Sequence, residues 1–230
     1  MIYVGRPDAP VALLEHAEEW QRQYKEAIDK LAETPGSLPL RKHKKKVESQ
    51  YNHPQIRQRL KDMFSSKCAY CESRIDHVAY SHIEHFRPKS IFPERCFSWD
   101  NLILACPRCN REKSDRFPTE EQNGPLVNPT QEEPDAFFLF EYDDQTGTAN
   151  VVANENYARA SVTVETIGLN RPELVKRRSL FVRNLVFIAC KASEGDPQAM
   201  ELLRLSTAGE SEYAAFARGI IRRLERDTHP

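Results

Sequence analysis

Cys68-Ala69-Tyr70-Cys71 and Cys106-Pro107-Arg108-Cys109 are two Cys-x-x-Cys pairs, separated by 34 residues. Each pair places two sulfur atoms on one tight turn, and four thiolates placed in this way can close a tetrahedral site around Zn²⁺. A closed set of four cysteines leaves no open position for a substrate, so the expected zinc is structural. The alternatives are two disulfides, a thioredoxin-like redox motif and an iron–sulfur cluster. The spacing favours zinc.

Between and just after the two pairs lie residues suited to hydrolytic chemistry. They are Ser81-His82-Ile83-Glu84-His85-Phe86-Arg87-Pro88-Lys89, then Trp99-Asp100-Asn101, and Asn110-Arg111-Glu112-Lys113 after the second pair. Phosphodiester cleavage needs a base to activate water, a divalent cation to stabilise charge on the phosphate, and groups that hold both in place. A neutral imidazole, with an unperturbed pKa of about 6.5, accepts a proton from water at physiological pH. Glutamate and asparagine oxygens suit Mg²⁺.

In this order the motifs resemble the HNH (ββα-metal) endonuclease family, over about residues 66 to 118. The resemblance implies two short strands that present the histidine and a following helix that presents the last motif residue. It implies His85 as the general base and Asn101 as the residue that orients it. Glu84 and Asn110 become ligands of a catalytic Mg²⁺ or Mn²⁺, and Lys113 faces the phosphate. Many members have aspartate in place of Glu84 and histidine in place of Asn110, so the metal preference stays open.

Several other residues are candidates for a role at the site, or else are structural or merely exposed to solvent. In a strand, His82 and His85 face opposite sides, so His82 is only a candidate neighbour of the site. The basic run 41–46 is either a solvated face or a surface that follows phosphates, and the sequence favours neither. The residues expected to contact substrate are Arg87, Lys89, Arg108 and Arg111. Expected to be structural are His53, His77 and His229, with Cys96 and Cys190 as packed thiols.

Composition is that of an ordinary globular protein: 230 residues, 40% hydrophobic and 29% charged, with 8 glycines. This excludes collagenous, low-complexity and largely disordered chains. The formal net charge is −1, so a nucleic-acid partner must be met by a local basic patch. No signal segment or membrane span is expected, and a cytoplasmic location follows.

The expected fold is α+β and mainly helical, with a central ββα-metal HNH module and its cysteine zinc site between two flanks. The expected regions are 1–65 (helical), 66–128 (nuclease module) and 129–230 (a hairpin plus helices). Apolar residues at three- and four-residue spacing predict a helix between Pro10 and Thr34. A second helix is predicted from Pro54. Farther on, the patterns predict a hairpin, 137–142 with 149–153, and helices over 157–167, 174–192 and 213–224.

The flanks narrow the resemblance to the HNH nucleases of Septu anti-phage systems and of retrons that carry the same pair. The strings Lys67–Glu72, His82–Ser90, Cys109–Pro118 and Ile167–Pro172 carry it. It implies a complex with an ABC-type ATPase, a defence role, and in a retron a reverse transcriptase with its DNA. The alternatives are a stand-alone HNH nuclease, a regulated RNA-cutting toxin, and a catalytically silent zinc module that binds nucleic acid or protein. DNA is the favoured substrate, with tRNA or other RNA left open.

Overall fold

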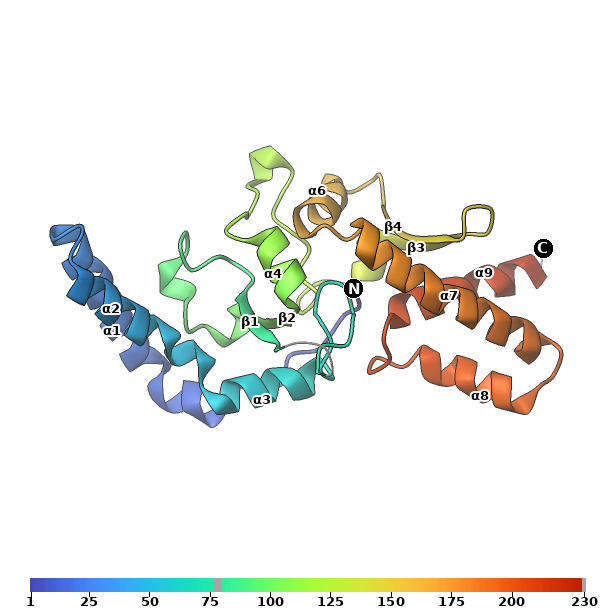
Figure 1. Cartoon of the computed structure of the whole chain (residues 1–230), viewed down its shortest axis with the longest axis horizontal. Helices are drawn as coiled ribbons and strands as arrows, with labels where there is room; N and C mark the ends of the chain where they lie inside the picture. The colour runs from blue at the N-terminus through green and yellow to red at the C-terminus, as the bar shows by residue number, and fades with distance from the viewer. Residues whose placement is uncertain (77–79, 229–230) are drawn as a thin grey trace.

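The computed structural model describes residues 1–76 and 80–228, and over these the chain is mainly helical. Two antiparallel sheets of two strands each lie within this described part: β1 (His82–His85) pairs with β2 (Leu102–Ala105), and β3 (Phe138–Asp143) with β4 (Thr148–Ala153). In Figure 1 the helices of the N-terminal part lie at one end, β1, β2 and a short helix at the centre, and the remaining helices at the other end. The mainly helical α+β class is confirmed.

The N-terminal part consists of α1 (Val11–Glu33), α2 (Leu38–Glu48), a 3₁₀ turn η1 (Ser49–Asn52) and α3 (Pro54–Met63). Helix α1 matches the predicted helix and buries its apolar stripe, including Leu13, Trp20 and Tyr24. The basic run lies on α2, a helix that was not predicted. Ser37 caps α2 by accepting a hydrogen bond from the Leu40 amide, and a proline stands in the first turn, as helix starts favour.

The centre has the order strand, strand, helix, which is the ββα arrangement that the resemblance implies. In the β1–β2 ladder, Glu84 lies opposite Ile103 and His85 opposite Leu102. Strand β2 is buried over its whole length and leads directly into α4 (Pro107–Lys113). Two 3₁₀ turns, η2 (Pro93–Arg95) and η3 (Trp99–Asn101), shape the connection between the strands.

The C-terminal part confirms the predicted hairpin and helices and adds two helices that were not predicted, one of four residues before the hairpin and one of ten residues near the end. It contains η4 (Glu120–Gln122), α5 (Pro134–Phe137), the β3–β4 hairpin, α6 (Ala158–Ile167), α7 (Pro172–Ser193), α8 (Pro197–Ser206) and α9 (Ala214–Thr228). Helix α8 was not predicted. It buries only Ala199 and leaves Met200, Leu202 and Leu205 exposed, so most of its apolar side chains do not contribute to the core.

The hydrophobic core runs through all three expected regions without interruption. One cluster includes Trp20 of α1, Leu104 of β2 and Phe216 of α9. Polar contacts also join the regions, since the Val4 amide donates to Pro129 O at 2.9 Å. The boundaries at 65/66 and 128/129 therefore stay a prediction. In the described part of the chain, no helix combines the length and apolar composition that a membrane span requires.

The minor cysteine and histidine predictions have mixed outcomes. Cys96 is fully buried, as expected of a packed thiol, but Cys190 is exposed and that prediction is wrong. Cys190 ends up exposed because it lies on the solvent side of α7, next to the buried Ala189. His53 is structural, since its Nδ1 accepts the Gln55 amide at the start of α3. His77 and His229 lie outside the described residues.

Candidate active site and metal centre

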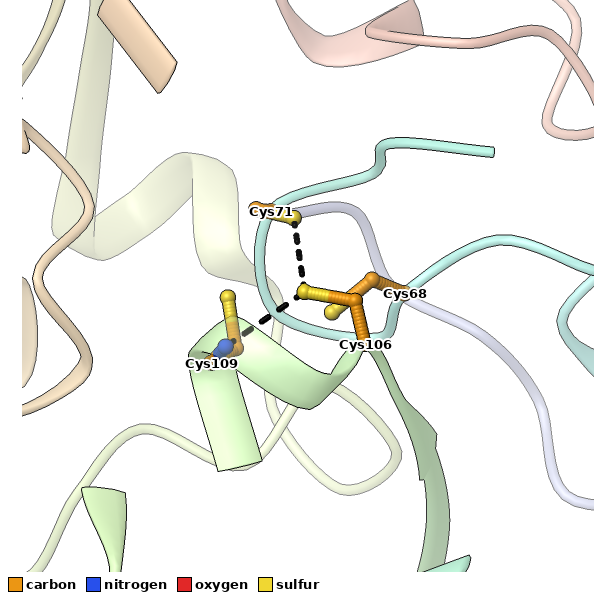
Figure 2. A group of neighbouring side chains, drawn as sticks. All are labelled: Cys68, Cys71, Cys106 and Cys109. Carbon is orange, nitrogen blue, oxygen red and sulfur yellow. Dashed lines mark hydrogen bonds between the residues drawn. The ribbon is translucent and has the colours of Figure 1, made fainter. Parts of the chain in front are cut away.

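The four cysteines of the two Cys-x-x-Cys pairs meet at one point. Figure 2 shows Cys68 and Cys71 on the loop after α3 facing Cys106 and Cys109 at the start of α4. Their sulfur atoms all lie within 4.8 Å of one another, and those of Cys71 and Cys106 are 3.9 Å apart. Tetrahedral Zn–S bonds of about 2.3 Å place sulfurs about 3.8 Å apart, whereas a disulfide needs about 2.05 Å. The cluster can therefore hold a single metal ion and is not a pair of disulfides.

An arginine that the sequence analysis did not single out lies beside this cluster. Arg171 Nη1 donates to Cys109 Sγ at 3.5 Å and to Gly168 O at 2.9 Å. Its half-buried guanidinium is deprived of water, which lowers its pKa, but the neighbouring cysteine sulfurs outweigh this and the net shift of the pKa is upward. Four thiolates around Zn²⁺ carry a net charge of −2, so a fixed cation next to one of them balances charge.

His85 lies at the end of β1 and is almost completely buried. Its Nε2 is 2.8 Å from Cys96 O, and because a carbonyl oxygen only accepts, Nε2 must carry the proton. In the neutral ring Nδ1 then has the lone pair. Burial, assisted by the positive charge of Lys89, lowers the pKa of His85 to about 4. The Tyr51 ring meets the imidazole edge-on, with centroids 4.6 Å apart. His85 is thus held in a neutral form with one defined basic nitrogen.

Lys113, which the resemblance implied would face the phosphate, points into the protein instead. Its side chain is fully buried, and its Nζ donates to Glu84 Oε1 at 2.7 Å and to His85 O at 3.0 Å. The expectation that it faces the phosphate is therefore wrong. The physical reason is that α4 packs onto β1, so its last turn points toward the strand. Burial raises the pKa of Glu84 against the opposing pull of Lys113.

Asn110 lies beside His82, a residue that the sequence analysis kept only as a candidate neighbour. Asn110 Nδ2 donates to His82 Nδ1 at 2.7 Å, which leaves Oδ1 as the ligand atom that the amide can offer. On β1, His82 and Glu84 share one face and His85 lies on the other, because side chains alternate along a strand. All three nevertheless line the same pocket, since His85 is the last residue of the strand.

Asn101 is buried and acts on the loop rather than on His85 directly. Its Oδ1 accepts the Arg87 amide at 2.7 Å, and its Nδ2 donates to Arg87 O and Arg95 O, both at 3.0 Å. Cys96, whose carbonyl oxygen accepts the hydrogen bond from His85 Nε2, directly follows Arg95. The amide of Asn101 thus holds the loop that orients the imidazole.

Glu84 and His85 line an open pocket of about 310 Å³. Besides Glu84 and His85, its wall is formed by His82, Pro88, Lys89, Pro107, Asn110, Arg111, Ser114 and Asp115. The geometry thus unites a neutral imidazole, a carboxylate and an amide at one cavity between β1 and α4, beside a separate four-cysteine cluster.

The HNH endonuclease family matches residues 68–116, the segment that contains both the pocket and the cysteines. The chain contains an HNH endonuclease domain. This HNH domain runs from the first cysteine pair to just beyond α4.

Similarity to known proteins extends beyond the HNH domain. The chain is 29% identical to Septu protein PtuB of Bacillus mycoides (strain KBAB4), over 67% of this chain and 60% of that protein. It is 25% identical to the retron Vc95 putative HNH endonuclease of Vibrio cholerae serotype O1 biovar El Tor, over 58% and 66% of the two chains. The chain is also 26% identical to Septu protein PtuA of Bacillus mycoides (strain KBAB4), over 52% of this chain and 20% of that protein. The matches thus span less than two thirds of each of these relatives.

The four basic residues expected to contact substrate divide into two pairs. Lys89 and Arg111 line the pocket of the HNH domain. Arg87 instead stacks on the rings of Phe92 and Phe117, and Arg108 lies 3.6 Å from Glu173 at the start of α7. Both are exposed, outside the pocket wall. The sequence analysis missed Tyr51, Ser114, Asp115 and Arg171. No local motif marks Tyr51, whereas Arg171 lies in the string Ile167–Pro172, and Ser114 and Asp115 directly follow Lys113 in the string Cys109–Pro118, without any role having been assigned to them.

Proposed function

We propose that the HNH domain hydrolyses phosphodiester bonds of nucleic acid, with His85 as the general base. The observation that carries the proposal is the hydrogen bond from His85 Nε2 to Cys96 O. It assigns the lone pair to Nδ1, and the lowered pKa of the buried ring keeps that nitrogen unprotonated at neutral pH. A base poised in this way takes a proton from water without first losing one of its own.

The reaction begins with a water molecule in the pocket. Nδ1 of His85 removes a proton from it, and the oxygen attacks phosphorus while the opposite P–O bond breaks. The leaving oxygen takes up a proton from solvent. Lys89 and Arg111 line the same pocket and are suited to hold the phosphate by charge-assisted hydrogen bonds. Asn101 donates to Arg95 O and so holds the loop whose next carbonyl, Cys96 O, orients the imidazole of His85.

A divalent cation fits the oxygen donors of the pocket. Glu84 lines the pocket and accepts from Lys113 through Oε1, and Asn110 donates through its amide nitrogen to His82 and keeps Oδ1 as a ligand atom. Such hard oxygen donors suit Mg²⁺ or Mn²⁺, which retain several waters. When bound, the ion would stabilise negative charge on the phosphate and on the leaving oxygen. Glu84 and Asn110 would hold it, with His82 positioning Asn110. The four cysteines would hold a structural Zn²⁺, since a closed thiolate set offers no open position.

The relatives support a role in defence against phage. Two of them carry Septu names and one a retron name. We infer that this chain is the nuclease effector of an anti-phage complex and acts in the cytoplasm with an ABC-type, PtuA-like ATPase. A retron reverse transcriptase and its DNA are further proposed partners. DNA is the proposed substrate, with tRNA and other RNA as the competing class, because activated water attacks a phosphodiester without needing a 2′-hydroxyl.

Cleavage assays with matched histidine variants test the proposal. The chain, alone and co-expressed with the ATPase, is incubated with plasmid DNA, phage DNA and tRNA in Mg²⁺ or Mn²⁺. His85→Ala should lower the rate by about 10²- to 10⁴-fold, the usual contribution of a general base. His16→Ala, which changes an exposed histidine, should cleave as the wild type does.

The outcomes separate the candidate functions. Cleavage that survives His85→Ala would point to another base or a contaminant. A folded, zinc-loaded complex that cuts no substrate would favour the alternative, a catalytically silent module that binds nucleic acid or protein. The substrate that is cut decides between DNA and RNA.

A further inference from the structure

Helix α2 carries an exposed basic row of Arg41, Lys42, Lys45 and Lys46, which we call the α2 basic row. Among the described residues, no carboxylate lies within 4.0 Å of any of the four cationic groups. Lys44, by contrast, is half-buried and bonded to Glu48 at 3.0 Å. The chain as a whole has a formal net charge of −1, so the row is a local concentration of positive charge rather than part of a basic protein.

The row follows one side of the helix toward its C-terminal end. Residues three and four apart are neighbours on a helix surface, so Arg41 and Lys45 lie in line with Glu48. At 1.5 Å per residue the distance along the axis from Arg41 to Glu48 is about 10 Å. Val47 lies on the other side of α2 and is buried, where α2 packs against α1. The basic row therefore faces away from the core.

The C-terminal end of α2 adjoins the pocket of the HNH domain. Glu48 Oε1 lies 3.5 Å from Nζ of Lys89, and Lys89 lines the pocket. Tyr51, in the turn that follows α2, contacts the His85 ring. The α2 basic row is exposed to solvent, and the helix that carries it ends at the Glu48–Lys89 ion pair at the edge of the pocket.

We propose that the α2 basic row binds the sugar-phosphate backbone of the strand that extends from the pocket, so that the substrate is a polynucleotide contacted at two places. This inference rests on the proposed nuclease function. Phosphates along one strand of a duplex are spaced by about 3.4 Å of helix axis, so the row, which is about 8 Å long from Arg41 to Lys46, spans roughly two such spacings. When unpaired lysines and arginines bind phosphates, the cations condensed on the nucleic acid are released. This release provides affinity that does not depend on the base sequence.

An acidic protein surface is the competing partner for the same charge. The structure favours nucleic acid because the C-terminal end of α2 adjoins, through the Glu48–Lys89 ion pair, the pocket in which the proposed reaction places a phosphate. Binding of a protein partner would not depend on whether this end of α2 lies next to the pocket.

Binding measurements with matched charge variants test the inference. Fluorescence anisotropy of labelled oligonucleotides of about 4 and about 20 nucleotides, lengths that bracket common single-strand sites, is followed with zinc-loaded full-length protein without Mg²⁺ or Mn²⁺. The test variant is Arg41→Gln/Lys45→Gln. The control is Lys176→Gln/Arg183→Gln, which removes two exposed charges from α7 and changes the net charge equally. Thermal unfolding checks that both variants are folded.

The expected result is a loss confined to the long oligonucleotide. The test variant should bind it on the order of tenfold more weakly at about 0.1 M salt, and the slope of log K against log salt should fall by about 0.7 to 0.9 per lost contact. Binding of the short oligonucleotide, and both affinities of the control, should match the wild type.

Two other outcomes overturn the inference, and a third overturns the proposed nuclease function. Equal binding of the long oligonucleotide by the test variant and the wild type would sink the inference. Equal binding together with lost association with the ATPase would assign the row to a protein partner, and would also sink it. If the folded wild type binds neither oligonucleotide and cuts no substrate, the proposed function itself fails.

Discussion

Lys113 Nζ lies 2.7 Å from Glu84 Oε1, and this ion pair joins the last residue of α4 to the third residue of β1 inside the protein. Lys113 has no exposed surface, and the side chain of Glu84 is 10% exposed. The pair fixes one carboxylate oxygen of Glu84, whose side chain also lines the pocket. Lys113 is thus placed to position a proposed metal ligand rather than to touch the substrate.

Removing the ammonium of Lys113 should destabilise the protein strongly. Lys113→Met leaves Glu84 as an unpaired buried carboxylate, and breaking such a pair costs about 3 to 5 kcal/mol in the free energy of unfolding. The double variant Glu84→Gln/Lys113→Met should recover part of this loss, because no charge then remains buried. Urea unfolding of the four proteins of this cycle, in solutions containing zinc, measures both values. A single variant as stable as the wild type would contradict the pairing.

Metal at the four cysteines should be necessary for the fold of the HNH domain. Structural zinc contributes on the order of 10 kcal/mol, which is comparable to the total stability of a domain. Cys106→Ser should therefore lose zinc and unfold at a much lower temperature, as should the wild type treated with a strong chelator. Metal analysis should find one zinc per wild-type chain. Cys190→Ser, at an exposed cysteine, is the control and should change neither zinc content nor melting temperature.

Arg171 should strengthen metal binding without being a ligand. Its hydrogen bond to Cys109 Sγ stabilises thiolate charge, and loss of such an outer contact typically weakens metal affinity by about 10- to 100-fold. Arg171→Met should therefore release zinc to a chromogenic chelator at a lower chelator concentration. Arg183→Met, the control, removes an exposed arginine from the helix that follows Arg171. If both variants release zinc alike, Arg171 has no special part in the metal centre.

Asn101 should be intolerant of a change that keeps its shape. Asn101→Asp retains an acceptor for the Arg87 amide but turns a carboxylate toward two backbone carbonyl oxygens, Arg87 O and Arg95 O. Each buried partner left unsatisfied costs about 1 to 3 kcal/mol. We expect a lower melting temperature, and slower cleavage because the loop that orients His85 is displaced. Asn156→Asp changes an exposed asparagine and should leave both measurements unaltered.

Local patterns predicted much of the architecture. The apolar stripe of α1, the proline at the start of α3 and the alternating strands of the hairpin were all visible, because each depends on residues close in sequence. The failures have the same origin. Helix α8 buries only one residue, and α2 is so rich in lysine that its single buried position, Val47, gives no periodic signal.

The sequence by itself determined the four-cysteine cluster and the order of the site motifs, because two Cys-x-x-Cys turns and the strings around His85 and Asn110 are short local features. Only the tertiary structure decided which side chains meet across them. Lys113 and Glu84 are 29 residues apart, Asn110 and His82 are 28, and Arg171 and Cys109 are 62. Such contacts depend on how α4 packs on β1 and on where the loop before α7 comes to rest. Periodicity specifies which face of an element is buried, but the partner of a buried polar group is set by packing in three dimensions.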